Sequence, residues 1–413
     1  MYSPSGPAAR RARRAPRSVV SWTRPRAARS SSRSMADMLP PHPLLPSAHS
    51  SWRYPATVPD VDELQRRFRS LAETAAPRAP LYSLLSSAIA EDREVVELLT
   101  AAPATQQAPV LLLAATHHLV LSGVAPDLAV HYPNLNGGDA SASDPWPAFR
   151  QLCSDHADDI RALVATRHTQ TNEVGRCATF LPVFAALARE TGRPIAHVDV
   201  GTSAGLTLLW DRYGYRYQPG PSLAADSDVV LPCGVRGDAP LPDALAPRVA
   251  GVGLDLHPID VTDTQATRWL EACVWPDQID RFHRLEAALS VARRSPPTIV
   301  QGDAVDDVAA LVRDAAQLGH AVVTTSWALN YLTAERQAEF VAVLDAVGRD
   351  VDVSWVAAES PEQTPGLALP HPPGTEHLTV LTLRTWRAGS VSTTALATAH
   401  PHGYWLHWLS QPT

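Results

Sequence analysis

The sequence predicts an α/β protein in which a helical segment precedes a parallel sheet that ends in an antiparallel hairpin. Three observations predict this class. Apolar residues recur with a helical period from about residue 58 to 193, short apolar strands alternate with helices from residue 195, and two alternating segments follow near the C-terminus. Alternating strands and helices give parallel strands that are covered by helices on both faces.

The chain divides into three parts. Residues 1–57 are rich in Pro, Ser and Arg and lack hydrophobic periodicity, so we expect a disordered leader there. Its Arg- and Ser-rich, acid-free start resembles a mitochondrial-type transit segment, but we favour the interpretation that translation starts further downstream. Residues 58–193 are expected to form a helical cap domain, and residues 194–413 the α/β domain.

In the cap domain, proline and glycine mark the ends of the clearest helix. Pro109 can start an apolar helix and Gly123 can end it. Its two histidines, His117 and His118, lie on apolar faces, so we expect them to be buried and hydrogen-bonded and not to bind metal. Three helices of this part have specific expected bounds, at 110–121, 146–166 and 173–191.

After residue 194 the pattern changes to alternating strands and helices. The strands are expected at 195–200, 249–255, 298–303, 321–325 and 351–358. The helices are expected at 204–213, 263–274, 305–317 and 333–348. Residues 214–248, rich in Pro, Gly, Tyr and Asp, are expected to form an inserted hairpin or loop. Segments 377–386 and 390–399 alternate as an antiparallel pair, and a last strand is expected at 404–409.

Composition excludes several kinds of chemistry. All 35 basic residues are arginine, so neither a Schiff-base lysine nor a P-loop lysine contributes. Residues 1–34 carry nine arginines and no acid, which leaves about −16 on the rest of a chain whose net charge is −7. An acidic body predicts no nucleic-acid partner, because phosphate binding needs a basic surface.

The four cysteines are far apart and form no C-x-x-C pair, which predicts reduced thiols and a cytoplasmic location. The longest apolar stretch is too short to span a bilayer, so no membrane association is expected. No metal is expected either, because no third ligand at a telling spacing accompanies His400 and His402.

The central motif is V-D-V-G-T-S-A-G at 198–205, directly after the first expected strand. Glycine at the carboxyl end of a parallel strand lets a ligand approach the backbone, because no Cβ blocks it. Asp199 lies at the strand end and can accept a hydrogen bond from an amine. The motif alone is compatible with three kinds of site.

A dinucleotide turn is disfavoured, because Ser203 and Leu206 occupy the second and third glycine positions of its G-x-G-x-x-G pattern. The α/β-hydrolase pattern G-x-S-x-G is matched from Gly201 to Gly205, with Ser203 as nucleophile. The third interpretation is the S-adenosylmethionine (SAM) turn of class I methyltransferases, in which an acid precedes glycines at the spacing D-x-G-x-x-x-G.

Acids at the next two strand ends favour the SAM interpretation. Asp255 ends the second strand, where an acid binds a ribose diol in SAM and dinucleotide folds. Asp303 ends the third, where an acid in the methyltransferase fold meets the adenine amine. The alternative is that these acids merely cap the following helices. The hydrolase interpretation expects several strands before the motif, where this chain has helices, but His400 and His402 keep it open.

Seven short motifs recur in the order of one bacterial family. They are Q-T-N-E-V-G-R at 170–176, S-A-G-L at 203–206, D-R-Y at 211–213, D-L-x-P-I-D-V at 255–261, R-W-L at 268–270, V-W-P at 274–276 and S-W at 326–327. On these motifs the chain resembles the bacterial domain-of-unknown-function family 2332 over about residues 58–410. This resemblance implies no reaction and supplies no catalytic residues. A looser resemblance to class I SAM-dependent methyltransferases covers residues 195–360.

Two polar groups are candidates to close over the ligand or to bind the methyl acceptor. The first lies at the start of the helix that leads into the first strand and consists of Gln170, Asn172, Glu173 and Arg176. Its alternative role is structural, with Thr171 or Asn172 capping the helix and Arg176 paired with Glu173. The second follows the fourth strand, where methyltransferases place acceptor-facing residues, and consists of Ser326, Trp327, Asn330 and Tyr331. Its alternative role is packing.

The predicted fold is therefore α/β, with a Rossmann-type, methyltransferase-like parallel sheet, a C-terminal antiparallel hairpin and an N-terminal helical domain. The expected function is binding of S-adenosyl-L-methionine and methyl transfer to a small-molecule acceptor. The alternatives are an α/β-hydrolase that uses Ser203 and a non-catalytic nucleoside-binding sensor. The residues expected to bind the cofactor are Asp199, Gly201, Ser203, Gly205, Asp255 and Asp303.

Overall fold

The computed structural model describes residues 59–139, 141–361 and 378–409. The expectation of disorder over residues 1–57 falls outside these ranges. Up to residue 191 the described chain is helical, with short 3₁₀ turns between helices. The helices of this part are α1 (Val61–Ala75), α2 (Pro80–Ile89), α3 (Arg93–Glu97), α4 (Pro109–Leu121), α5 (Pro126–Ala129), α6 (Trp146–Asp155), α7 (Ala157–Thr166) and α8 (Cys177–Thr191).

Local sequence explains where these helices begin and end. The side chain of Asp60 accepts a hydrogen bond from the Glu63 amide at the start of α1, and Pro109 is the first residue of α4. Gly192 closes α8 in the left-handed conformation, at φ 64°. The single helix expected at 146–166 is instead divided into α6 and α7, because His156 leaves the helical conformation.

The helical part has its own hydrophobic core, built around α4. As predicted, His117 is buried and hydrogen-bonded: its Nδ1 lies 3.1 Å from the Ala272 carbonyl oxygen, and Asn134 Nδ2 lies 3.2 Å from its Nε2. His118 is also buried. The same core includes Trp269 of α9 (Thr264–Ala272), which follows the second strand of the central parallel sheet.

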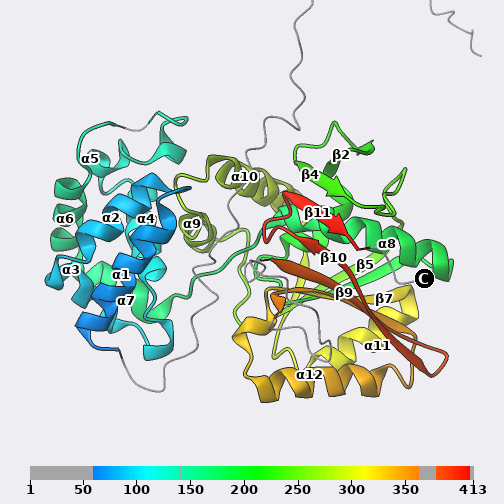
Figure 1. The fold of residues 1–413 in the computed structure, drawn as a ribbon. Coiled ribbons are helices and arrows are strands. Elements are labelled where there is room, and N and C mark those ends of the chain that lie inside the picture. The colour runs from blue at the N-terminus through cyan, green and yellow to red at the C-terminus, as the bar shows by residue number, and fades with distance from the viewer. Residues whose placement is uncertain (1–58, 140, 362–377, 410–413) are drawn as a thin grey trace, which may run out of the picture. The chain divides into compact units, whose positions relative to one another are not determined.

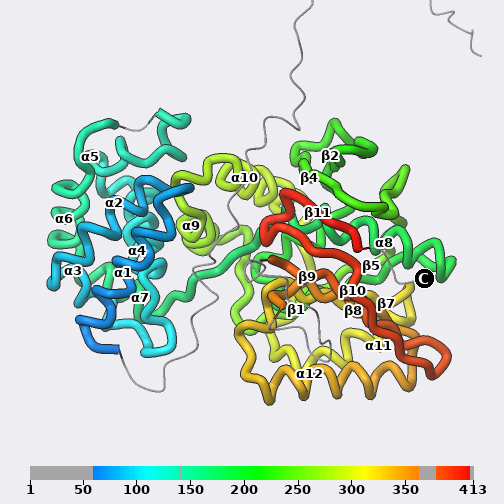
Figure 2. The backbone as a smooth tube through the Cα atoms, in the orientation of Figure 1, coloured from blue at the N-terminus to red at the C-terminus, as the bar shows by residue number. Residues whose placement is uncertain are grey.

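The described strands form one large sheet. They are β1 (Ile195–Val200), β2 (Gly214–Gln218), β3 (Ser222–Leu223), β4 (Val230–Arg236), β5 (Arg248–Asp255), β6 (Thr298–Gln301), β7 (His320–Ser326), β8 (Val353–Glu359), β9 (Thr379–Arg387), β10 (Ser390–Ala399) and β11 (Trp405–Trp408). Across the sheet the order is β3-β2-β4-β11-β10-β9-β8-β7-β1-β5-β6. Figures 1 and 2 label most of these strands. The expected C-terminal antiparallel hairpin is β9–β10, and the start of its first expected segment, residue 377, lies outside the described residues.

The central region, β6-β5-β1-β7-β8, is parallel throughout. Every residue of β1 is buried, and alternate side chains enter two different cores. Ala196, Val198 and Val200 share a core with residues of α11 (Val308–Leu318) and α12 (Ala334–Val347), while Ile195 packs with α8. Helices therefore cover both faces of the parallel sheet, as the alternation of strands and helices predicted.

Three segments differ from the sequence-based expectation or were missed by it. The α-helix expected at 204–213 is a 3₁₀ helix, η5 (Leu206–Arg212), because Leu209 leaves the helical conformation and the hydroxyls of Tyr213 and Tyr215 donate to the Leu206 and Trp210 carbonyls. The expected insertion at 214–248 contains the hairpin β2–β3 and the strand β4, which extend the sheet through β11. Helix α10 (Ile279–Arg294) was not predicted, although Phe282, Leu285 and Leu289 follow the helical period.

Candidate functional site

The motif at 198–205 forms a tight turn between β1 and η5. Gly201, Ser203 and Gly205 all have positive φ, at 75°, 56° and 70°. A Cβ on Gly201 would lie 2.6 Å from the Ala328 Cβ, and one on Gly205 would lie 2.7 Å from the Pro297 Cγ. Glycine is needed at both positions because the loop meets protein atoms at close range.

Asp199 is almost fully enclosed, with 3% of its surface exposed. Its carboxylate accepts hydrogen bonds from the hydroxyls of Thr202, at 2.8 Å, Thr324, at 2.5 Å, and Thr207. The Nε2 of His197 lies 2.7 Å from the same Thr324 hydroxyl oxygen. The carboxylate of Asp199 therefore ties β1 to β7 and to the turn, inside the protein.

Asp255 is half-buried at the carboxyl end of β5, beside the turn. Its Oδ2 accepts a hydrogen bond from the Ser203 amide at 2.7 Å, and its Oδ1 accepts one from the His257 amide at 2.8 Å. The next side chain, Leu256, is 56% exposed. A carboxylate has about four acceptor positions, so two remain for a ligand after these two bonds. Asp255 thus combines an accessible acceptor pair with an adjacent apolar surface.

Asp303 follows β6 and is committed to local structure. It accepts hydrogen bonds from the amides of Val305, at 2.7 Å, and Asp306, at 3.2 Å, and from Arg336 at 2.5 Å. Burial works against its ionisation, but these donors outweigh burial and lower the pKa of Asp303 below its usual value. These are the contacts expected of an acid that caps the following turn.

Two side chains from the segment before α8 hold the turn at 201–206. Gln170 Oε1 accepts a hydrogen bond from the Ser203 hydroxyl at 2.8 Å, and Gln170 Nε2 donates to the His257 carbonyl at 3.3 Å. Asn172 donates to the Thr202 carbonyl at 2.5 Å and accepts from the Leu206 amide at 3.2 Å. The sequence analysis grouped these residues, and the structure brings them together with Ser203 and Asp255.

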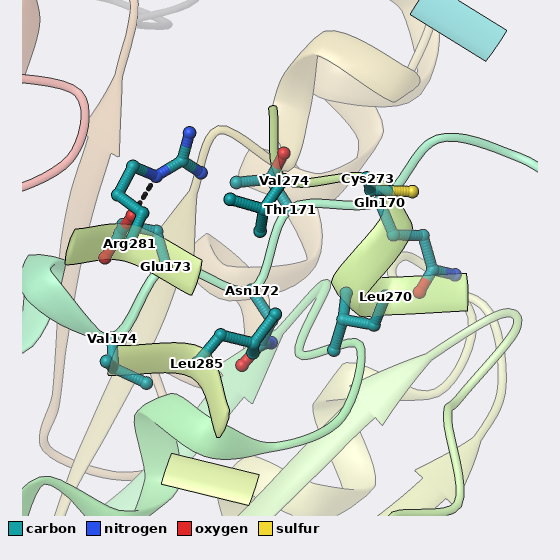
Figure 3. Close-up of a pocket in the computed structure, with 10 residues that line it drawn as sticks. All are labelled: Gln170, Thr171, Asn172, Glu173, Val174, Leu270, Cys273, Val274, Arg281 and Leu285. Atoms are coloured by element: carbon teal, nitrogen blue, oxygen red, sulfur yellow. Dashed lines mark hydrogen bonds and ion pairs between the residues drawn. The ribbon is translucent and has the colours of Figure 1, made fainter. Parts of the chain in front are cut away.

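A small pocket lies beside these amides (Figure 3). It has room for about one water molecule. Its lining combines side chains from the segment before α8, most of them polar, with mostly apolar side chains from α9, α10 and the segment between them, and with Arg281 of α10. The lining residues are Gln170, Thr171, Asn172, Glu173, Val174, Leu270, Cys273, Val274, Arg281 and Leu285.

The expected structural pairing of Arg176 with Glu173 is wrong. Glu173 instead caps the 3₁₀ turn η4 (Val174–Arg176) by accepting from the Gly175 amide at 3.0 Å, and neither Thr171 nor Asn172 does so. Its carboxylate faces α10, where Arg281 Nε donates to it at 2.6 Å. Arg176 points elsewhere, donating to the Pro401 carbonyl at 2.8 Å and to the carbonyl and hydroxyl of Ser326 at 2.9 and 3.1 Å.

The segment after β7 carries the second predicted group. Trp327 has φ 54° and donates from its indole to the Thr379 hydroxyl at 2.8 Å, so it anchors β9. Asn330 is half-buried in the 3₁₀ turn η6 (Leu329–Tyr331), and Tyr331 is largely exposed. Of this group, Ser326 contacts Arg176, which joins the two predicted clusters.

Glu359, at the end of β8, was not among the residues predicted from the sequence. One oxygen accepts from the Ala328 amide at 3.2 Å, and the other is buried without a hydrogen-bond partner among the described residues. Burial raises the pKa of Glu359 to about 7. An acid at the end of an apolar strand is the signal that identified Asp199, and it identifies Glu359 equally well.

Together, the fold and site define an α/β protein whose polar side chains gather at the carboxyl ends of central parallel strands. The family model described as "Uncharacterized protein conserved in bacteria (DUF2332)" matches residues 65–408. The chain therefore belongs to the DUF2332 family. No curated protein and no solved structure matches it.

Proposed function

We propose that this protein binds S-adenosylmethionine at the carboxyl edge of the parallel sheet and transfers its methyl group to a small-molecule acceptor. The observation that carries the proposal is the position of Asp255 at the end of β5, hydrogen-bonded to the Ser203 amide of the turn after β1. In open α/β sheets, ligands bind outside the carboxyl ends of the strands, where the strand order reverses. That reversal lies between β1 and β7 here.

The nucleoside part of the cofactor fits the residues present. The two acceptor positions left on the Asp255 carboxylate suit the vicinal hydroxyls of a ribose, and the exposed Leu256 offers an apolar surface for a base. The space beside the turn glycines is already occupied by Ala328 and Pro297, and the carboxylate of Asp199 is surrounded by the hydroxyls that donate to it. Binding therefore rests on Asp255 and its neighbours, more than on the turn glycines.

In this proposal the cofactor supplies an activated methyl group, and the protein holds the cofactor and the acceptor in position for the transfer. Gln170 and Asn172 fix the turn that presents the Ser203 amide to Asp255. Asp255 orients the ribose. A nucleoside sensor would use the same contacts without turnover.

The hydroxyl geometry of Ser203 does not favour the hydrolase alternative. Its partner is the amide oxygen of Gln170, and an amide oxygen is too weak a base to take the serine proton. A nucleophilic serine requires a base such as histidine at hydrogen-bonding distance.

The test is isothermal titration of the full chain with SAM and with S-adenosylhomocysteine. Replacing Asp255 with asparagine should weaken binding roughly 10- to 150-fold, or about 1.5–3 kcal/mol, because a charged acceptor for the diol is lost. Asp260→Asn is the matched control, since this exposed acid lies on the same loop and, among the described residues, its side chain bonds to Thr262 alone. It should bind like the wild type.

No binding of either ligand to the wild type at millimolar concentration would refute the cofactor assignment. If binding occurs, incubation with methyl-labelled SAM and a bacterial small-molecule extract separates an enzyme from a sensor. Formation of S-adenosylhomocysteine with a labelled product supports methyl transfer, whereas binding without turnover supports the sensor.

A further inference from the structure

A second polar cluster, which the cofactor proposal does not use, surrounds Glu173. Two arginines of α10 and a histidine near the C-terminus contact it, and Arg176 lies nearby with its hydrogen bonds directed to Pro401 and Ser326. The members are Glu173, Arg176, Arg281, Arg284 and His402, and we call them the Glu173 cluster. Arg281 Nε donates to Glu173 at 2.6 Å, Arg284 Nε lies 3.3 Å away, and His402 Nδ1 lies 3.8 Å away.

The backbone is built to bring these segments together. A Cβ on Gly175 would lie 2.3 Å from the His402 carbonyl oxygen, and one on Gly403 would lie 2.0 Å from the Gly175 carbonyl oxygen. Only glycine at both positions allows the turn before β11 to pack this closely on η4. Arg176 then fixes this turn by donating to Pro401.

The charge in the Glu173 cluster is unbalanced. Three guanidinium groups, each about nine-tenths buried, lie around a single carboxylate with direct ionic contacts to two of them. Glu359 adds charge near Arg176, but burial raises its pKa to about 7, so it is only partly ionised at neutral pH. Buried cations without matching anions are costly, unless another anion completes the set.

The cluster also has buried nitrogens without hydrogen bonds. Within the described chain, Arg284 Nε and His402 Nδ1 are buried and make none, since the 3.3 Å contact from Arg284 to Glu173 lacks hydrogen-bond geometry. Arg284 also packs over the Tyr404 ring, 5.3 Å from its centroid, and Nη2 donates to the Tyr404 hydroxyl at 3.3 Å. Arg284 is thus held in place while its Nε makes no hydrogen bond within the described chain.

The small pocket gives one approach to the cluster. Glu173 and Arg281 belong both to its lining and to the cluster. Arg281 bonds to Glu173 through Nε and donates from Nη1 to the side-chain oxygen of Gln278, so among the described residues Nη2 is the nitrogen of its guanidinium group that makes no hydrogen bond (Figure 3). An oxygen of an anionic ligand that enters this pocket would meet the guanidinium group of Arg281 and the amides of Gln170 and Asn172.

We propose that the Glu173 cluster is a binding site for an oxyanion, the carboxylate or phosphate group of a small ligand. Planar guanidinium groups bind both kinds of group through paired hydrogen bonds. This proposal stands independently of SAM binding.

The experiment uses the full chain and two probes, inorganic phosphate and succinate, with sodium chloride holding the ionic strength constant. Calorimetric titration and thermal unfolding should show saturable binding and stabilisation by at least one probe, and none by chloride. The stronger probe identifies the class of oxyanion. Arg284→Gln should weaken its binding at least tenfold, because one of the buried donors is lost.

Arg294→Gln is the matched control, on the same helix and with the same change of charge, because Arg294 is exposed and pairs with Asp228. It should bind like the wild type. If Arg284→Gln does not fold, Arg284→Lys keeps the charge but removes the planar fork, and should still bind several-fold more weakly. Absence of saturable binding to the wild type overturns the proposal, and so does unchanged affinity in a folded Arg284 variant.

Discussion

At the residue scale, the partner of each polar group decides what that group can do. Ser203 and Asp255 belong to one hydrogen-bonded unit, in which the serine hydroxyl donates to Gln170 and the serine amide donates to Asp255. Asp199 and Asp303 carry the same carboxylate as Asp255, but both already have several protein donors. Hydroxyls donate to Asp199, whereas amides and an arginine donate to Asp303. Of the three, Asp255 has the contacts that best suit a ligand.

The unactivated hydroxyl of Ser203 leads to a direct prediction. A fluorophosphonate probe should not label this serine, because the Gln170 amide cannot act as a base. Mass spectrometry of the labelled chain measures the modification, with a known serine hydrolase as positive control. Stoichiometric labelling that disappears in Ser203→Ala would instead establish a nucleophilic serine.

At the element scale, close approach between loops shapes the site. The turn after β1 contacts the loop after β7 at Gly201 and the residues before β6 at Gly205. The amide side chains of Gln170 and Asn172 then hold this turn against the segment before α8. The geometry of the site therefore depends on the packing of these loops as much as on the strands.

Two glycines with similar backbones allow this packing to be tested. Gly205→Ala puts a Cβ 2.7 Å from Pro297, whereas Gly192→Ala at the end of α8 has nothing within 4 Å. Both have a positive φ, at 70° and 64°, so both alanines pay a similar backbone cost of about 1 kcal/mol. The free energy of unfolding of Gly205→Ala should be lower by about 1–3 kcal/mol more, through overpacking.

Urea denaturation of both variants measures the difference. Equal losses would show that Pro297 and the neighbouring chain move away at little cost. In that case the turn is held less tightly than its contacts indicate.

Most elements could be predicted from the sequence because their signals are local. Short apolar runs between helices predicted the parallel strands, and the C-terminal alternation predicted β9 and β10. The pairing of β4 with β11 could not be predicted, because it joins segments about 170 residues apart without any local pattern. Helix α10 was not predicted, although its apolar residues follow a helical period.

The candidate site likewise contains residues with a local sequence signal and residues without one. Its central turn, Asp255 and the amides of Gln170 and Asn172 were all identified from motifs at strand or helix ends. Arg281 and Arg284 were not, because their partner Glu173 lies more than 100 residues earlier and no spacing connects them. Sequence reasoning finds groups that one segment carries, and misses those that only tertiary packing assembles.

At the scale of the whole molecule, the helical core and the parallel sheet both bury titratable groups away from water. His117 lies in the helical core, and His197 and His320 lie on the central strands. None of the described helices has the length and apolar character to cross a membrane. Because these histidines are buried, the stability of the fold should depend on pH.

Stability should fall as pH decreases from about 7 to 5.5. Burial lowers the pKa of His117 to about 3 and those of His197 and His320 to about 4, so all three stay neutral in the fold. In the unfolded chain they take up protons below about pH 6.5, and each then costs about 1.4 kcal/mol per pH unit. Glu359 acts in the opposite direction, because burial raises its pKa to about 7 and the fold prefers its protonated form.

Three histidines outweigh one glutamate, so these four groups together should lower the free energy of unfolding by about 2 kcal/mol over this range. Urea denaturation at several pH values measures the slope. His320→Asn should flatten it by about one proton, because one of the groups that protonates only on unfolding is gone. His407→Asn, which changes an exposed histidine, should leave the slope as in the wild type. A stability that stays constant or rises toward pH 5.5 would show that the buried histidines reach solvent or are already protonated in the folded protein.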